Sequence, residues 1–270
     1  MIRPLGENAS EDWEDQALVR RVQQGSREAL ELLVSRHQPW IYNIVLRMMY
    51  HMQDAEDATQ EILIKLLTKV STFDGRSSFR TWLYRIAVNH VLNMKRGRAG
   101  TAVVSFSEYG RGLDGAADME LQDTSTAAAD VQLLVSEAKI GCTSGMLLCL
   151  DRTQRLVYIL GTIFGVPDTV GAELLEITRE NFRQKLVRAR RDLHGFMENQ
   201  CGLVNHANPC RCARKTQAFI DGGFIDPQHL LFARECVTRV CEVAEKTCDS
   251  IDALDEAYRD SSRSSVPGTT

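Results

Sequence analysis

Apolar residues recur every three or four positions over most of the chain, which is the spacing of one face of an α-helix. From Ser26 onward the stripe includes Leu30, Leu33, Ile41 and Val45. Ser26 precedes the stripe, and serine is a residue type that caps helix N-termini. Strand-like alternation is scarce, and no repeat of roughly 20–50 residues is present. The pattern therefore predicts an all-α fold.

Three more helices are expected in the first half, over residues 16–25, 54–67 and 77–96. In the segment DAEDATQEILIKLL, Asp57 and Glu61 are four positions apart and share a helix face. This acidic face is either a solvated surface or a docking site for a basic partner.

The segment 77–96 combines Arg85, Asn89 and Arg96 with the aromatic residues Trp82 and Tyr84. Cations neutralise phosphates and aromatic rings stack on unpaired bases, so this combination suits nucleic acid. The alternative is that the two aromatic side chains pack in a hydrophobic core.

A helix-turn-helix is predicted near the middle of the second half. Residues 168–175 form a short helix, 176–178 a tight turn with Thr178 as N-cap, and 179–196 a longer helix. In such motifs the start of the second helix enters the major groove, where arginine reads guanine and asparagine or glutamine reads adenine. The alternative is a helical hairpin without a role in DNA binding. The polar residues at the reading positions are Arg179, Asn181, Arg183 and Gln184.

Charge is segregated along the chain, although the whole has a net charge of −4 and a pI near 5.9. Residues 75–107 carry no acidic side chain, and 179–191 carry six Lys or Arg against Glu180. The 270 residues allow one or two domains, and we expect two. The predicted organisation is an acidic N-terminal tail (1–15), a first domain (16–98), a flexible acidic linker (99–140), a second domain (141–198) and a cysteine-containing extension (199–270).

No stretch has the length and apolar character of a membrane span, and the acidic start differs from a signal peptide. We therefore expect a cytoplasmic location and no membrane partner. Eight cysteines in a reducing compartment are not expected to form a disulfide framework.

A short Gly-, Asn- and Pro-containing segment at the start of the extension holds Cys201, His206, Cys210 and Cys212. Thiolate and imidazole ligands suit Zn²⁺, and a Cys-x-Cys pair also suits Cu⁺. A redox-reactive thiol pair and ordinary structural cysteines are the alternatives. Beyond it, residues 226–258 are expected to form a helix with Asp226 as N-cap, which we expect to pack on one of the domains as a regulator.

The order of these motifs resembles a sigma-70 family initiation factor of the extracytoplasmic-function (ECF) subgroup. The resemblance rests on DAEDATQEILIKLL, FDGRSSFRTWLYRIAVNHVLNMKR, LDRTQRLVYI and LLEITRENFRQKLVRARRDL. It covers about residues 17–98 (region 2) and 146–197 (region 4). It implies a promoter-specificity subunit without enzymatic activity, which needs no cofactor for its basal role.

The resemblance also implies roles for individual positions. The partners would be core RNA polymerase, through its β′ and β subunits, promoter DNA and, in some cases, an anti-sigma factor. The acidic face would contact β′ through Asp57, Gln60 and Glu61. The −10 element would be bound by Phe73, Arg76, Arg80, Trp82, Arg85, Asn89, Lys95 and Arg96. The −35 element would be bound by Arg179, Asn181, Arg183, Gln184, Lys185 and Arg188.

The first helix of the helix-turn-helix departs from the family pattern. Gly171 lies inside it, and Glu176 stands where the family often has a glycine. Two rival functions stay open at this point. One is a stand-alone helix-turn-helix regulator with a metal- or redox-sensing tail, and the other is an enzyme or metal-storage protein centred on the cysteines.

Overall fold

The computed structural model describes residues 9–94, 104–119 and 128–230. Within these ranges the regular structure is helical, apart from one isolated β-bridge. The prediction of an all-α fold is confirmed. No helix among the described residues is both long and apolar enough to cross a membrane.

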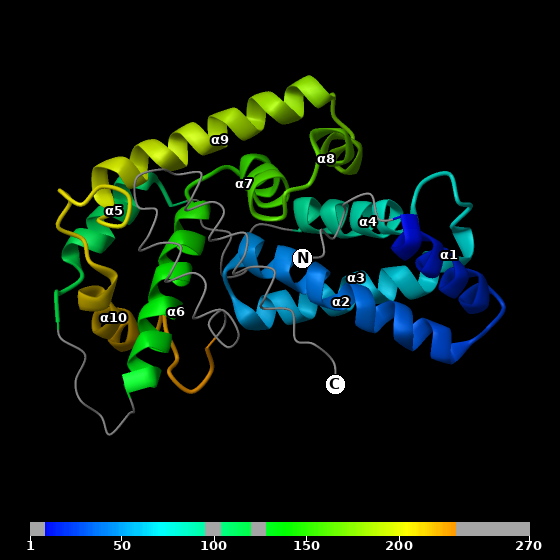
Figure 1. The fold of residues 1–270 in the computed structure, drawn as a ribbon, viewed down its shortest axis with the longest axis horizontal. Helices are drawn as coiled ribbons and strands as arrows, with labels where there is room; N and C mark the ends of the chain where they lie inside the picture. Colours follow the sequence, from blue (N-terminus) through cyan, green and yellow to red (C-terminus); the bar gives the residue numbers. More distant parts are fainter. Residues whose placement is uncertain (1–8, 95–103, 120–127, 231–270) are drawn as a thin grey trace.

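The N-terminal half contains helices α1 to α4, drawn from blue to cyan in Figure 1. Ser26 caps α2 as predicted, because its hydroxyl oxygen accepts a hydrogen bond from the Ala29 N–H at 3.3 Å. Tyr50 ends α2 in the left-handed conformation with φ of 52°, and α3 begins two residues later. The helices are α1 (Ala9–Gln23), α2 (Arg27–Met49), α3 (Met52–Lys69) with the short 3₁₀ turn η1 (Val70–Thr72), and α4 (Phe79–Asn93).

The C-terminal half contains the predicted helix-turn-helix. The helix bounds 168–175 are confirmed, and Thr178 caps the second helix by accepting a hydrogen bond from the Asn181 N–H at 3.1 Å. The elements are α5 (Phe106–Gly115), α6 (Ala128–Leu147), α7 (Arg152–Tyr158), the π-helical turn η2 (Ile159–Ile163), α8 (Asp168–Leu175), α9 (Arg179–Gln200) and α10 (Cys212–Asp221).

Gly171 has a packing role that the sequence did not reveal. A Cβ atom at this position would lie 2.5 Å from the ring of Phe182, which is fully buried on α9. A glycine therefore lets α8 and α9 approach closely, and this offsets its unfavourable helix propensity. At the turn, Glu176 adopts φ of 54°, a left-handed conformation in which glycine is more common.

The predicted flexible linker (99–140) differs from the structure in its described part. It contains α5 and most of α6. Ser105 and Glu108 form a reciprocal capping box that starts α5. In α6, Ala138 and Ile140 are buried, and this helix packs along α10 (Figure 1). The acidic composition of residues 99–140 indicated a solvated chain. In the structure, however, α6 packs against α10 of the extension.

The predicted helix over 226–258 lies mostly outside the described residues. Within them, residues 226–230 form a turn in which the Asp226 carboxylate accepts a hydrogen bond from the Gln228 N–H at 2.9 Å. This helix therefore does not begin at Asp226 as expected. The described extension instead forms α10, which precedes that turn.

The two halves pack against each other and share one hydrophobic core. In Figure 1, α8 lies directly above α4, and these two helices are in contact. The rings of Trp40 on α2 and Phe164 lie 5.4 Å apart. The buried guanidinium of Arg155 donates to the Met48 carbonyl at 2.6 Å, and Arg152 donates to the Met94 carbonyl at 2.6 Å. The halves thus meet through ring contacts, backbone hydrogen bonds and apolar packing.

Candidate functional site

The acidic face of α3 is accessible at two of its three predicted positions. Gln60 and Glu61 are exposed, whereas Asp57 is half-buried. On the same helix Ile64 is 57% exposed and Leu67 is 45% exposed. Large apolar side chains beside exposed polar ones are typical of a protein-binding surface.

His90 of α4 lies at the edge of this acidic face. Its Nδ1 lies 2.5 Å from Nζ of Lys65, and its Nε2 lies 3.5 Å from Oε2 of Glu61. Burial and the neighbouring lysine charge lower the pKa of His90. The lowered pKa favours the neutral form of this imidazole, which lies beside the exposed Glu61 carboxylate.

Three aromatic side chains form a cluster between the loop before α4 and the start of α4. Phe73 lies 5.6 Å from Phe79 and 5.5 Å from Trp82, and Phe79 lies 5.7 Å from Trp82, measured between ring centroids. Phe79 is fully buried, whereas Phe73 and Trp82 are half-buried. The cluster fixes the loop against the helix, and the two half-buried rings keep part of their surface available.

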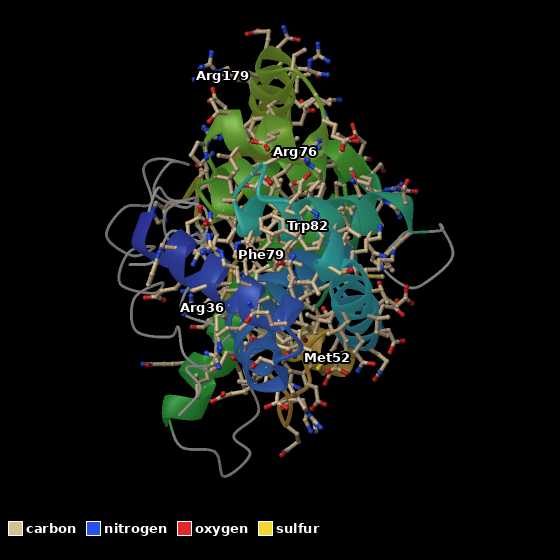
Figure 2. All side chains as sticks on the ribbon, turned by 90° about the vertical axis from the view of Figure 1, so that its right-hand side faces the viewer. Arg36, Met52, Arg76, Phe79, Trp82 and Arg179 are labelled. Carbon is tan, nitrogen blue, oxygen red and sulfur yellow. The ribbon has the colours of Figure 1, made fainter. Side chains whose placement is uncertain are left out.

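The polar side chains on and before α4 differ in availability. Arg76 is exposed and pairs with Asp74 at 2.8 Å, and Asn89 is exposed. Arg85 donates from Nη2 to Oε1 of Glu173 on α8 at 3.0 Å. Figure 2 shows Arg76 and Trp82 below Arg179, which lies at the start of α9. Lys95 and Arg96 lie outside the described residues.

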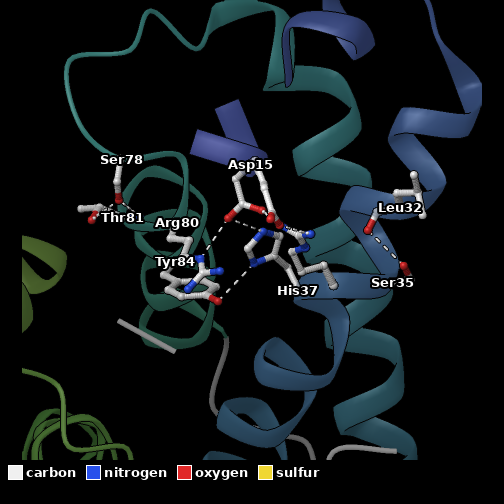
Figure 3. A network of polar contacts seen from close by, with 10 residues as sticks. Asp15, Leu32, Ser35, His37, Ser78, Arg80, Thr81 and Tyr84 are labelled. Carbon is white, nitrogen blue, oxygen red and sulfur yellow. Dashed lines mark hydrogen bonds and ion pairs between the residues drawn. The ribbon is translucent and has the colours of Figure 1, made fainter. Parts of the chain in front are cut away.

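Arg80 does not lie on the surface where the resemblance would need it. Its side chain is buried, and Nε donates to Oδ2 of Asp15 on α1 at 2.9 Å. Figure 3 shows Asp15 at the centre of this network. Its Oδ1 also accepts from Arg36 at 2.8 Å, and Nε2 of His37 lies 3.2 Å from Oδ2. A DNA contact by Arg80 would require this network to open.

Asp15 is the residue whose role the sequence did not reveal, since it was assigned to an acidic tail. Burial alone would raise its pKa, but the hydrogen bonds of His37, Arg80 and Arg36 outweigh burial and lower the pKa of Asp15 to about 2. The carboxylate is therefore ionised and fully buried. It joins α1 to α2 and α4, so the described part of the predicted tail is a packed helix.

The predicted reading face of α9 is largely accessible. Asn181, Gln184 and Arg188 are exposed, and Lys185 is half-buried. Gln184 donates to Glu180 at 3.0 Å, within the same helix.

The other two predicted −35 residues, Arg179 and Arg183, both pair with Asp168 at the start of α8. The Arg179 Nε to Asp168 Oδ1 distance is 2.8 Å. The hydrogen bond from Arg179, followed by that from Arg183, lowers the pKa of Asp168. One carboxylate thus holds two arginines that were expected to contact DNA.

The predicted metal set is only partly brought together. Cys201 and Cys210 pair in the isolated parallel β-bridge, whereas His206 is exposed. Among the described residues, no three His, Cys, Asp or Glu side chains form a group that could hold a metal ion. Cys142 of α6, which the sequence did not single out, influences the pKa of Cys212, so it lies near the cysteine segment.

A family model named sigma-70 region 2 matches residues 33–101. The match covers most of α2 together with α3 and α4. The matched residues carry the acidic face, the aromatic cluster and Arg85.

Curated relatives match a similar length of chain. Over 87 residues the chain is 44% identical to the RNA polymerase sigma-H factor of Pseudomonas aeruginosa. This matched stretch covers 32% of this chain and 45% of the relative. Over 84 residues it is 46% identical to the ECF RNA polymerase sigma-E factor of Haemophilus influenzae, which covers 31% of this chain and 44% of the relative. The chain thus spans less than half the length of these relatives.

A solved structure of CnrH in complex with the cytosolic domain of CnrY resembles the fold with a TM-score of 0.50. The comparison covers 68% of this chain and 97% of that chain at 20% sequence identity. At this identity the likeness concerns the fold alone. It extends beyond residues 33–101 and therefore includes part of the C-terminal half.

Proposed function

Because the chain belongs to the sigma-70 family, with a region 2 at residues 33–101, we propose that it binds bacterial core RNA polymerase and directs transcription initiation. In this role it is an ECF-type specificity subunit, not an enzyme, and it needs no cofactor for basal activity. The observation that carries the proposal is the identity of 44% over 87 residues with a named sigma factor. A cytoplasmic location follows from this role.

The acidic face of α3 is the proposed contact with core polymerase. Glu61 and Gln60 are exposed, and Ile64 and Leu67 add apolar surface beside them. A basic partner surface, such as the coiled coil of β′ implied by the resemblance, would complement the charge, while the apolar residues bury area. The contact with β and the binding of an anti-sigma factor are proposals from the resemblance alone.

The loop before α4 and the outer face of α4 are the proposed −10 site. Asn89 and Arg85 present amide and guanidinium donors, and Phe73 and Trp82 offer ring surface beside them. A base flipped from the duplex costs a few kcal/mol of stacking, which a pocket with hydrogen-bond groups and rings offsets for the right base. Arg76 would contact phosphate.

The start of α9 is the proposed −35 site. Asn181 and Gln184 can form paired hydrogen bonds with adenine, and Arg179 and Arg183 can do so with guanine once Asp168 releases them. Lys185 and Arg188 would contact phosphates.

The −10 and −35 elements cannot be bound at the same time in the arrangement described above. About 25 base pairs separate −10 from −35, which is about 85 Å at ~3.4 Å per base pair. Arg85 of the −10 site, however, lies 3.0 Å from Glu173 on the helix that precedes α9. We therefore infer that α8 leaves α4 when the protein joins core polymerase.

The test is promoter-directed transcription with a bacterial core polymerase, together with a native-gel assay of core binding. The double substitution Asp57→Arg and Glu61→Arg should abolish core binding and transcription. Glu31→Arg reverses an exposed carboxylate on α2 and serves as the control, which should stay active. Full core binding by the double variant would refute the proposed face.

DNA binding by the free protein, without any core binding by the unaltered chain, would favour the rival function. In that case the chain is a stand-alone helix-turn-helix regulator. The exposed reading face of α9 is the observation that supports this second candidate. Elemental analysis of the reduced protein would reveal a Zn²⁺ or Cu⁺ ion bound in the extension.

A further inference from the structure

Residues 201–210 form a loop that is held by many internal hydrogen bonds. The Cys201 carbonyl accepts from the Asn205 N–H at 3.0 Å and from Nδ2 of Asn208 at 3.2 Å. The Arg211 guanidinium donates to the His206 and Cys210 carbonyls, both at 3.0 Å. The two ends of the loop are thereby fixed side by side.

Cys201 and Cys210 face each other at these ends, as partners of a parallel β-bridge. Bridged strands lie about 4.8 Å apart, and a disulfide needs Cα atoms roughly 4.4–6.8 Å apart. Gly202 shows how close the approach is, because a Cβ atom there would collide with the Cys210 carbonyl oxygen. Neither cysteine forms a disulfide in this structure.

We propose that Cys201 and Cys210 are a redox pair, which a hydroperoxide converts reversibly into a disulfide. In a reducing compartment, two cysteines that form a disulfide only on oxidation are typical of a redox sensor. The cysteine pair lies outside both proposed promoter-binding surfaces. Its oxidation would therefore be a modification separate from promoter binding.

The reaction consumes one hydroperoxide for each disulfide. The thiolate of Cys210, the more exposed of the two, attacks the peroxide oxygen, forms a sulfenic acid and releases an alcohol or water. The Cys201 thiol then attacks that sulfur, the S–S bond forms, and the hydroxyl leaves as water after taking up the thiol proton. A small thiol reductant restores both thiols by exchange.

Burial and two nearby cations act on the Cys210 thiol in opposite directions. Burial raises the pKa of Cys210, and the nearby Cys201 adds to the rise, while Lys215 and Arg211 oppose it. Burial also raises the pKa of Cys142 to about 12 and that of Cys212 well above its usual value. Cys210 is the half-exposed thiol that has these two cations beside it, so it is the best placed to react.

The disulfide would connect two parts of the molecule that matter for function. Cys201 is the C-terminal cap of α9, and Cys212 begins α10 two residues after Cys210. In Figure 1, α10 lies beside α6, at the end of the molecule away from α8. Oxidation would therefore tie the end of the proposed DNA-reading helix to the extension.

The first test treats the reduced full-length protein with a hydroperoxide and maps disulfides by mass spectrometry of peptides. A Cys201–Cys210 disulfide that dithiothreitol reverses is expected. The oxidised protein should melt about 5 °C higher than the reduced one. A disulfide from Cys210 to another cysteine, or no disulfide, would overturn the proposal.

Two pairs of variants locate the reaction. Cys210→Ser should abolish the disulfide, whereas Cys149→Ser, at a half-buried thiol between α6 and α7, should not change it. Gly202→Ala should slow formation at least tenfold, since it separates the strands while both thiols remain. Gly195→Ala on α9, where a Cβ meets no atom within 4 Å, is its control. An unchanged rate in Gly202→Ala would overturn the bridge geometry as the cause.

Elemental analysis of the same reduced protein separates oxidation from metal binding. About one Zn²⁺ or Cu⁺ per chain, lost in Cys210→Ser and protecting the thiols from peroxide, would overturn the redox proposal in favour of a metal site. Transcription by the reduced protein is measured separately, so a failure here leaves the proposed sigma function untouched.

Discussion

Helices α4 and α9 are both rich in cationic and amide side chains, but the structure treats their charges differently. On α4, Arg80 is buried against Asp15 of α1, and Arg85 pairs with Glu173 of α8. On α9, the partner of Arg179 and Arg183 is the Asp168 carboxylate at the surface of the same motif. Arg80 is therefore unavailable to a polyanion, whereas Arg85, Arg179 and Arg183 are held by surface ion pairs that an outside partner can replace.

The largest effect is expected from breaking the buried partner of α4. Asp15→Ala leaves Arg80 and Arg36 without their shared carboxylate and should lower the free energy of unfolding by about 3–5 kcal/mol. Urea denaturation measures the loss. Glu14→Gln, at an exposed carboxylate that also pairs with Arg36, is the control and should cost less than about 1 kcal/mol. Equal losses in both variants would contradict the importance of the buried pair.

The pH dependence of stability sharpens the same point. The pKa of Asp15 is lowered from 3.8 to about 2, so its contribution is fully present above pH 3.8 and is lost as pH falls through about 2. This difference corresponds to about 2 kcal/mol. The stability gap between the unaltered protein and Asp15→Asn, followed by urea denaturation, should shrink by that amount from pH 5 to pH 2. A constant gap over this range would mean that the carboxylate is not specifically stabilised.

A smaller effect is expected where the second partner of α4 is removed. Glu173→Gln weakens the surface ion pair with Arg85 by about 1 kcal/mol or less, which favours separation of α8 from α4 by up to about fivefold. Fluorescence anisotropy of free protein with single-stranded −10 DNA should show a matching gain in affinity.

Glu176→Gln, at an exposed carboxylate at the end of the same helix, is the matched control for Glu173→Gln. It should leave the affinity for −10 DNA unchanged. An equal gain in both variants would point to net charge instead of the Arg85 pair.

The smallest effect concerns α9. Asp168→Asn should release Arg179 and Arg183. The affinity of the holoenzyme for −35 DNA should then increase by less than about fivefold, with the larger increase at low salt. Asp192→Asn, whose partner Arg191 lies farther along α9, is the control. A loss of affinity would show that Asp168 orients the two arginines for base reading.

Local features were predictable because neighbouring residues determine them. The helix bounds at 168–175 and the caps at Ser26 and Thr178 depend on side chains within three positions of the backbone that they cap. The resemblance to sigma-70 factors likewise followed from short segments in a fixed order, and the sigma-70 region 2 model matches residues 33–101.

Contacts across the chain were not predictable from such patterns. Asp15 and Arg80 are 65 positions apart, and Arg85 and Glu173 are 88 positions apart. Spacing tells which face of a helix a side chain occupies, but not which other helix covers that face. For the same reason α6 was mistaken for part of a flexible linker, since its apolar residues pack on a segment far along the chain.

Arg155 donates hydrogen bonds both across the two halves and within the C-terminal half. Besides the Met48 carbonyl of α2, its guanidinium donates to the carbonyls of Leu147, Leu148 and Leu150 at 2.9, 3.0 and 3.2 Å. Those three bonds lie within the C-terminal half, so the proposed separation would not break them. Burial lowers the pKa of Arg155 to about 10, so contact with water would return it toward its ordinary value. In the proposed separation, the residue that joins the halves would therefore also hold the α6–α7 corner together.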